Sequence, residues 1–277
     1  MHLSALNIHP VKSLRAMRVQ SASVDALGAV GDRRFLVIQP NGTFLTQRAV
    51  PRMATVDALI DDTTLTLRTG GSPDLAVPRA SDPGAPLMSV RIWKSEGLQA
   101  EDCGGEAAAW LTAALGIPCR LVRAGVAFRR PVLKAAARAG DIHAFADACA
   151  FLAISEASLD DLNDRIVQGG GEPVGMDRFR TNLVLSGCTP FQEDTWKRFR
   201  IGNVVFRSAG PSTRCIVTTT DQLTGVRGVE PLRTLARFRR DPADPTDVMF
   251  GQNLVHESLS GVIRVGDPVE VLEKSEH

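Results

Sequence analysis

The chain has 277 residues, 44% of them apolar, which is enough to build the core of one large domain or two modest ones. Its 32 Lys and Arg residues balance 31 acidic ones, and a net charge of +1 gives no reason to expect nonspecific binding to nucleic acid or membranes. No apolar stretch is long enough for a membrane span, and the N-terminus shows no signal-peptide pattern. Five scattered cysteines without a C-x-x-C pair argue against a structural zinc or iron–sulfur site, and we expect a cytoplasmic protein.

The first part of the chain predicts a run of strands. Asn41-Gly42 lies between two apolar runs in residues 35–47, which predicts a β-hairpin. Residues 64–78 alternate threonine with leucine before a Gly-Gly turn and predict a second hairpin, and residues 90–103 predict one more strand.

A helix is expected over residues 106–115, because apolar side chains recur there at helical spacing and Gly116 follows as a natural terminator. The segment 123–148 is rich in Arg, Ala and Gly and has weak periodicity. We therefore expect a long loop there, and it is the best candidate for a boundary between two domains.

The second half continues the β-rich pattern. A helix is expected to begin near Ser155, with Ser155 or Ser158 as its cap, and a short helix is expected with Pro231 in its first position. Four further stretches predict strands: residues 178–187, 199–210, 214–221 and 261–273. The fold class expected is a β-rich mixed α/β fold, in which helices lie between barrel-like strands.

Cys215 is the first candidate for chemistry, within the stretch GPSTRCIVTTTD. A thiol there could be a buried small hydrophobe, a nucleophile or a metal ligand, and composition alone favours the buried thiol. A functional thiol would need a nearby cation, and a turn at residues 211–213 would let Arg214 and Cys215 face one site.

Several basic residues are candidates for binding an anion. Lys12 and Ser13 could hold a phosphate, although a solvated lysine at a strand end is the simpler interpretation. Arg33 and Arg34 are expected to alternate across a strand, which would turn one of them toward the interior or a cleft. A third strand is expected to carry Arg178, Arg180 and Asn182 on one face, which either binds an anion or faces solvent.

Three common enzyme classes lack their sequence patterns here. The histidines show no metal-binding spacing, which argues against a zinc hydrolase; they are His2, His9, His143, His256 and His277. There is no G-x-S-x-G elbow and no G-x-G-x-x-G after a strand, which argues against a standard serine hydrolase and a Rossmann dehydrogenase.

The order of these pieces along the chain is more specific than any one of them. The pieces are IHPVKSL, DRRFLVI, FLTQRAVPRM, DCGGEAAAWL, AISEASLDDLNDR, RFRTNLVLSGC, EDTW, TRCIVTTTDQLTGV, FGQNLV and SGVIRVGDPVEVL. Together they resemble the MOSC-domain family with its N-terminal β-barrel domain, as found in mitochondrial amidoxime-reducing components and their bacterial relatives. The resemblance implies an N-terminal MOSC β-barrel domain over residues 1–122 and a MOSC β-barrel domain with interspersed helices over residues 123–277.

The resemblance also implies a cofactor and a site. It implies a molybdenum–molybdopterin cofactor with Cys215 as the metal ligand and catalytic residue. The cofactor-binding positions that it implies are Lys12, Ser13, Arg33, Asp147, Arg180, Asn182, Thr213 and Arg214. Where relatives often have Gly-Tyr-Pro or a similar triplet after the aspartate, this chain has Ala148-Cys149-Ala150, so the loop can differ in shape and Cys149 could lie near the site.

The activity implied is reduction of N-hydroxylated compounds, namely amidoximes, hydroxylamines and N-hydroxylated bases. The chain has no nicotinamide or flavin fingerprint and no iron–sulfur cysteine set, so electrons should come from a separate ferredoxin-like or cytochrome b5-like protein and its reductase. Two alternatives stay open. One is a sulfur carrier or molybdenum-cofactor carrier that uses a Cys215 persulfide, as in the C-terminal part of molybdenum cofactor sulfurases, and the other is a non-catalytic interaction module.

Overall fold

The computed structural model describes residues 1–275, and Glu276 and His277 lie outside the described part. The strands in chain order are β1 His2–Ile8, β2 Met17–Val19, β3 Ser21–Asp25, β4 Gly28–Ala29, β5 Phe35–Ile38, β6 Asp57–Ile60, β7 Thr64–Arg68, β8 Leu75–Pro78, β9 Leu87–Ile92, β10 Ser95–Asp102, β11 Arg120–Arg123, β12 Phe151–Ser155, β13 Leu183–Ser186, β14 Trp196–Ile201, β15 Val204–Thr213, β16 Met249–His256, β17 Gly261–Arg264 and β18 Val269–Lys274. The α-helices are α1 Gly105–Leu115, α2 Glu156–Gln168 and α3 Leu232–Phe238, and the short 3₁₀ helices are η1 Pro51–Thr55, η2 Met176–Phe179, η3 Gln192–Thr195 and η4 Ile216–Thr219.

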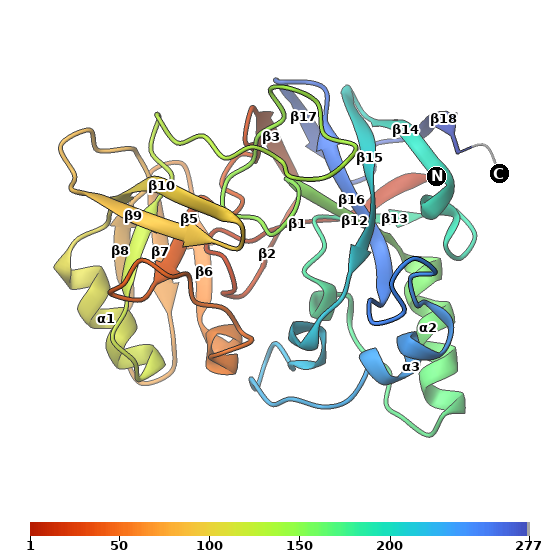
Figure 1. The fold of residues 1–277 in the computed structure, drawn as a ribbon, viewed down its shortest axis with the longest axis horizontal. Helices are drawn as coiled ribbons and strands as arrows, with labels where there is room; N and C mark the ends of the chain where they lie inside the picture. The colour runs from red at the N-terminus through yellow and green to blue at the C-terminus, as the bar shows by residue number, and fades with distance from the viewer. Residues whose placement is uncertain (276–277) are drawn as a thin grey trace.

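The strands form two lobes that lie side by side (Figure 1). The first lobe holds the sheets β5-β11-β10-β9 and β6-β7-β8 together with α1. The second lobe holds an eight-stranded sheet in the order β18-β14-β15-β16-β12-β13-β1-β2, a small sheet β17-β3-β4, and the helices α2 and α3. The expected β-rich mixed fold is confirmed.

The start of the chain belongs to the sheet of the second lobe. β1 pairs antiparallel with β13, and β3 pairs antiparallel with β17 near the C-terminus. The first strands therefore bring the segment that follows β1 to the junction of the lobes. The division into domains at residue 122 stays a prediction.

One hydrophobic cluster continues from the first lobe into the second. It includes Leu65 and Leu67 of β7, as well as Phe199 and Phe206 on β14 and β15. Each fully buried side chain of this size stabilises the fold by about 1.5–3 kcal/mol relative to an exposed one. A second cluster packs α2 against the sheet, so the lobes have both a shared core and a local one.

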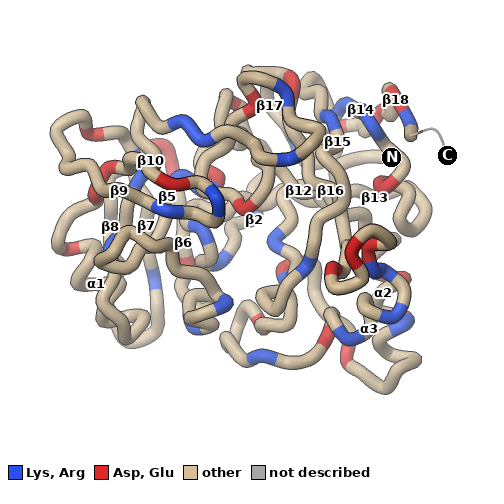
Figure 2. The backbone as a smooth tube through the Cα atoms, viewed as in Figure 1, with Lys and Arg blue, Asp and Glu red and all other residues tan. Residues whose placement is uncertain are grey.

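Charged residues of both signs are interspersed over both lobes, and no large face of one sign stands out in this view (Figure 2). This distribution agrees with the balanced composition. None of the helices within residues 1–275 combines the length and the apolar character needed to cross a bilayer.

Local sequence signals place most elements correctly. The hairpin over residues 64–78 is formed by β7 and β8, and α1 ends at Gly116 with a φ of 74°. Ser155 caps α2, because its hydroxyl accepts a hydrogen bond of 3.1 Å from the Ser158 N–H. The Asn41-Gly42 turn is also present, although its second arm forms isolated bridges, from Phe44 to Ile38 and from Thr43 to Arg91, rather than a strand.

Three expectations for strands and one for a turn are wrong. Residues 90–103 form the hairpin β9–β10 rather than one strand, and its turn holds Trp93 at a φ of 52°. Residues 178–187 begin in η2 and become a strand only at Leu183. Residues 211–213 do not form a turn but end β15, and residues 214–221 contain η4 instead of a strand.

The physical reason for η4 lies in its hydroxyl side chains. Thr218 Oγ1 donates to the Cys215 carbonyl at 2.9 Å, and Thr219 Oγ1 donates to the Ile216 carbonyl at 2.9 Å. Such local bonds give the backbone an alternative to a sheet ladder, and here they outweigh the β propensity of the threonines.

Candidate functional site

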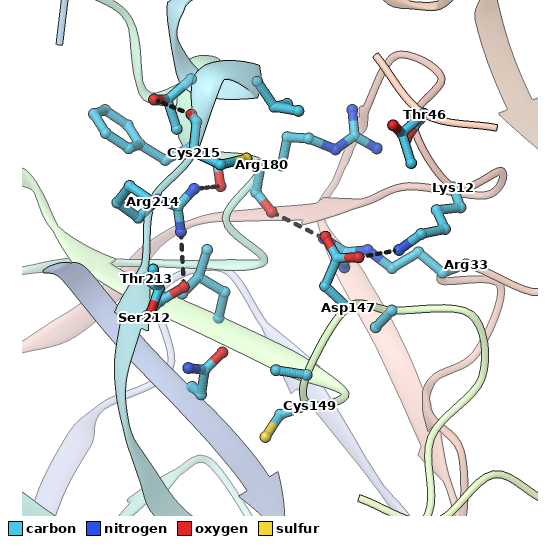
Figure 3. A pocket seen from close by; sticks show the side chains of 18 of the residues that line it. Lys12, Arg33, Thr46, Asp147, Cys149, Arg180, Ser212, Thr213, Arg214 and Cys215 are labelled. Carbon is cyan, nitrogen blue, oxygen red and sulfur yellow. Dashed lines mark hydrogen bonds and ion pairs between the residues drawn. The ribbon is translucent and has the colours of Figure 1, made fainter. Parts of the chain in front are cut away.

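A cavity of about 200 Å³ lies at the junction of the two lobes. All nine site residues implied by the family resemblance line it: Lys12, Ser13, Arg33, Asp147, Arg180, Asn182, Thr213, Arg214 and Cys215. In Figure 3, Lys12, Arg33 and Asp147 lie on one side, and Thr213, Arg214 and Cys215 lie on the other. The structure thus brings the predicted set together, and the roles of its members stay predictions.

Strained backbone positions gather at this cavity. Five non-glycine residues within residues 1–275 have a positive φ, and four of them line the cavity: Ser13, Arg33, Trp93 and Arg180. A non-glycine residue in this region costs of order 1–3 kcal/mol and persists only when the surrounding structure holds it. The concentration of strain here is typical of a functional site.

Arg33 is held from several sides. Its guanidinium donates to Asp32 Oδ2 at 2.6 Å, to Asn182 Oδ1 at 2.9 Å and to the Arg180 carbonyl at 3.0 Å. Asn182 in turn donates to the Asn7 carbonyl at 3.1 Å. Because both ends of the Asn182 amide are engaged within the protein, the structure supports positioning of Arg33 by Asn182.

The expected alternation of Arg33 and Arg34 across a strand is wrong, because both precede β5 and Arg33 has a φ of 46°. Arg34 turns away to an ion pair of 2.6 Å with Asp25. Arg178 also leaves the cavity and pairs with Asp221 at 2.9 Å, so it does not share a face with Arg180.

Arg180 and Arg214 are bound mainly through neutral oxygens. Arg180 Nη1 donates to the Leu14 carbonyl at 2.7 Å, and Arg214 Nη2 donates to the Phe179 carbonyl at 2.7 Å. Two buried nitrogens, Arg180 Nη2 and Arg214 Nε, have no hydrogen-bond partner within residues 1–275. Burial, and then the neighbouring Arg33, lower the pKa of Arg180 to about 9, and burial lowers the pKa of Arg214 to about 10.

Lys12 and Asp147 form an ion pair of 2.5 Å between Nζ and Oδ1. The Trp93 indole N–H donates to the same carboxylate oxygen at 2.8 Å. Burial lowers the pKa of Lys12 to about 8 despite the opposing effect of Asp147. Partial burial disfavours the Asp147 carboxylate, but the Lys12 ammonium outweighs it and holds the pKa of Asp147 below its usual range.

The charges that line the cavity are strongly unbalanced. Six cations line it against the single carboxylate of Asp147; they are Lys12, Arg33, Arg48, Lys134, Arg180 and Arg214. Arg48 also stacks over the Trp93 ring at 4.5 Å. Like charges in one cavity repel each other unless an anion binds among them, so the lining fits an anionic ligand.

Two thiols line the cavity, and they differ. Cys215 lies two residues beyond the end of β15, at the start of η4, and is half-buried. Cys149 is buried, and burial raises the pKa of its thiol to about 12. Figure 3 shows the two side chains well apart. The hypothesis that Cys149 lies near the site agrees with its place in the lining, and Cys103, Cys119 and Cys188 are not among the lining residues.

Sequence reasoning missed several lining residues. Thr46, Arg48 and Trp93 come from the first lobe, Lys134 from the long loop and Ser212 from β15. The stretch FLTQRAVPRM contains Arg48 but indicates no chemical role for it, and Trp93 lies in an expected strand. The cysteine at 215 also stands alone, since no group of three or more His, Cys, Asp or Glu that could hold a metal occurs within residues 1–275.

Comparison with known proteins identifies the family. The MOSC N-terminal beta barrel domain matches residues 1–118, and the MOSC domain matches residues 140–270. The chain belongs to the MOSC-domain family. It is 37% identical to "Mitochondrial amidoxime-reducing component 1" of Mus musculus, over 98% of this chain and 82% of that protein, and 36% identical to the Homo sapiens protein of the same name with the same coverage.

A relative with a different name matches almost as much of this chain. "Molybdenum cofactor sulfurase" of Danio rerio is 33% identical over 92% of this chain and 32% of its own length. The YUAD protein from Bacillus subtilis, a solved structure, has a TM-score of 0.37 at 10% identity, covering 97% of this chain and 93% of that one. The names of the sequence relatives connect this family with amidoxime reduction and with the molybdenum cofactor.

The residues of the cavity fit a molybdenum–pterin cofactor. Its phosphate would balance the excess of positive charge in the cavity. It could also accept hydrogen bonds from Arg180 Nη2 and Arg214 Nε, which have no partner within residues 1–275. Its metal is one that accepts a thiolate, and Cys215 offers a half-buried thiol at the cavity wall.

Proposed function

We propose that this MOSC protein is a molybdenum-cofactor-dependent reductase of N-hydroxylated compounds: amidoximes, hydroxylamines and N-hydroxylated bases. The observation that carries the proposal is that one cavity is lined by six cations, by the Cys215 thiol and by one carboxylate, that of Asp147. The names of the relatives, which describe amidoxime-reducing components, support the class of reaction.

The chain's own residues divide the work of binding. Lys12, Arg180 and Arg214 bind the anionic part of the cofactor, and Ser13 and Thr213 add short polar contacts. Arg33 is oriented by Asp32 and Asn182, so its charge is placed before the ligand arrives. Cys215 supplies the one protein thiolate. When bound, the cofactor supplies two-electron chemistry at the N–O bond, which with two protons yields the N–H product and water.

Electrons reach the site from a separate carrier, ferredoxin-like or cytochrome b5-like, with its own reductase. The sequence has no nicotinamide fingerprint, no flavin-type Gly-rich turn and no iron–sulfur cysteine set. Metal-loaded protein with NADH alone should therefore leave benzamidoxime unchanged. The same protein with a reduced viologen dye should convert it to benzamidine.

A second candidate is a carrier of sulfur or of the molybdenum cofactor, with a persulfide on Cys215. The likeness to a molybdenum cofactor sulfurase favours it. Dye-driven turnover of benzamidoxime by the loaded protein supports the reductase. Sulfane sulfur that cyanide releases from Cys215, together with no dye-driven turnover, would support the carrier instead.

A further inference from the structure

Immediately after the site, the chain exposes an unusual number of apolar side chains. Leu223, Val226 and Val229 expose 72%, 66% and 59% of their surfaces, and Ile216, next to Cys215, exposes 44%. We call these four residues the apolar patch. Single exposed apolar side chains are normal, but a group of them marks an interaction surface. Three of the four lie on the loop 220–230, and Ile216 begins η4.

The loop that carries the patch is firmly held. Asp221 N–H donates to the Val226 carbonyl at 2.8 Å, which closes the loop on itself. Arg15 donates to the Gln222 carbonyl at 2.9 Å, and Arg227 donates to the Gln47 carbonyl at 2.6 Å. These bonds tie the loop to the segments before and after β5, so its exposed side chains stand on a fixed base.

The patch also lies close to the wall of the cavity. The Gly228 N–H donates to the Thr219 carbonyl at 2.9 Å, so the returning arm of the loop pairs with the end of η4. Val217 and Thr218 of the same short helix line the cavity beside Cys215. The short helix η4 thus lines the cavity through Val217 and Thr218, and it adjoins the apolar patch.

The charges around the patch are positive. Arg227 lies in the loop and donates to the Arg48 carbonyl, and the Arg52 backbone lies beside Gly225 of the loop. Arg48, Arg52 and Arg227 have no ion pair within residues 1–275. The two acids of the loop are neutralised, because Asp221 pairs with Arg178 at 2.9 Å and Glu230 pairs with Arg233 at 2.7 Å. An apolar centre with a basic rim is complementary to a protein with an apolar centre and an acidic rim.

We propose that the apolar patch is the docking surface for a small acidic one-electron carrier protein that delivers electrons to the site beside Cys215. The proposal rests on the reductase function above, because only a reductase needs such a carrier. The rim charges speed the encounter and make it sensitive to salt, while the patch supplies the desolvated centre of a weak, transient interface.

The test compares two electron sources in the cofactor-loaded full chain. One is reduced methyl viologen, and the others are two acidic carriers, a cytochrome b5 haem domain and a [2Fe–2S] ferredoxin, each reduced by its own reductase. The double variant Leu223→Asp/Val226→Asp should lower kcat/KM for the carrier that supports wild-type turnover by about ten-fold or more. Dye-driven turnover should not change, since neither side chain lines the cavity.

Arg52→Glu should produce a smaller loss and should flatten the salt dependence of the carrier-driven rate. The matched controls are Leu259→Asp and Arg264→Glu, two exposed residues at and before β17, on the opposite edge of the molecule (Figure 1). Both controls should behave like wild type with every electron source.

Calorimetric titration of the oxidised carrier into each variant gives a readout that needs no turnover. Weaker carrier binding by the patch variants, and unchanged binding by the controls, supports the docking surface. Unchanged binding by Leu223→Asp/Val226→Asp, or an equal loss of dye-driven turnover in it, would overturn the docking surface. Absence of dye-driven turnover in the loaded wild-type protein would instead contradict the proposed reductase function. The titration would still show whether the carrier binds at the apolar patch.

Discussion

Two buried arginine environments in this molecule have opposite chemistry. In the first lobe, Arg123 donates to Glu101 at 2.9 Å and to the Pro78 carbonyl at 2.7 Å, and both charged side chains are almost fully buried. At the cavity, Arg180 and Arg214 contact carbonyl and hydroxyl oxygens, and within residues 1–275 each keeps a buried nitrogen without a partner. We call the first arrangement complete, because the cation has its own carboxylate. We call the second incomplete, because no carboxylate within residues 1–275 bonds to either guanidinium.

The difference matters because a buried charge carries a desolvation cost that a partner has to offset. A buried ion pair offsets that cost within the fold, and its loss exposes the full penalty. A buried cation without a carboxylate partner keeps the penalty until a ligand arrives. Several such cations in one cavity therefore stabilise the protein only when an anion is bound among them.

A similar contrast exists between the two cavity thiols, Cys215 and Cys149, and the largest expected effect on turnover comes from changing Cys215. Cys215→Ser should reduce dye-driven turnover to background, because an alkoxide is a harder and more basic ligand than a thiolate and should not replace it. The fold should survive, since the exchange alters little volume. Cys149→Ser is the matched control in the same cavity and should retain turnover. Retained turnover in metal-loaded Cys215→Ser would contradict the assignment of Cys215 as the metal ligand.

Breaking the complete environment should cost folding stability. Arg123→Met leaves the Glu101 carboxylate buried without its cation and should lower the free energy of unfolding by about 3–5 kcal/mol. Chemical denaturation of the cofactor-free protein measures it. The double variant Arg123→Met/Glu101→Leu should recover most of the loss, and a single variant as stable as wild type would show that the pair is not truly buried.

Breaking the incomplete environment should cost binding and not stability. Arg180→Ala should weaken cofactor retention by on the order of 1.5–3 kcal/mol, through the loss of a charge-assisted contact. The cofactor-free variant should be no less stable than wild type, because a repulsive charge is gone. Equilibrium dialysis and denaturation measure the two quantities. Wild-type retention of the cofactor by Arg180→Ala would mean that this side chain does not reach the ligand.

The smallest effect concerns pH. Burial holds the pKa of Lys12 at about 8, below its unfolded value of 10.5. As pH rises through 8 the folded protein loses this charge, so the affinity of the cofactor-free protein for pyrophosphate should fall between pH 7 and 9. The same deprotonation relieves a buried charge, so the empty protein should gain stability from pH 8 toward 10.5.

Lys12→Arg is the control for this titration, since its guanidinium keeps the charge over the whole range. Its pyrophosphate affinity should vary less with pH than that of wild type. If the wild-type and variant profiles coincide, another group controls the pH dependence.

The sequence predicts those parts of the fold that local patterns determine. The hairpin over residues 64–78 and the caps of α1 and α2 follow from alternation, Gly116 and Ser155, and the structure contains them. The strand expected at residues 214–221 fails because the hydroxyls of Thr218 and Thr219 bond to nearby carbonyls, which strand propensity does not capture.

Local patterns indicate Cys215 and several basic residues one by one, but only the resemblance to a family places them in one site. Its residues come from segments far apart in the chain, and no local pattern connects Lys12 with Cys215. Arg48 and Trp93 were missed, because only the packing of the two lobes brings them to the cavity. The orientation of Arg33 depends on Asp32 and Asn182, and it too is visible only in three dimensions.

The central claim is that the cation-lined cavity holds a molybdenum–pterin cofactor through Cys215. The most direct test measures molybdenum and pterin in protein purified from a host that makes the cofactor, for wild type, Arg180→Ala and Cys149→Ser. We predict stoichiometric molybdenum and pterin in wild type and Cys149→Ser, and a clear loss of both in Arg180→Ala. Wild-type protein without molybdenum and pterin, from a host that loads another molybdenum enzyme in parallel, would contradict the account.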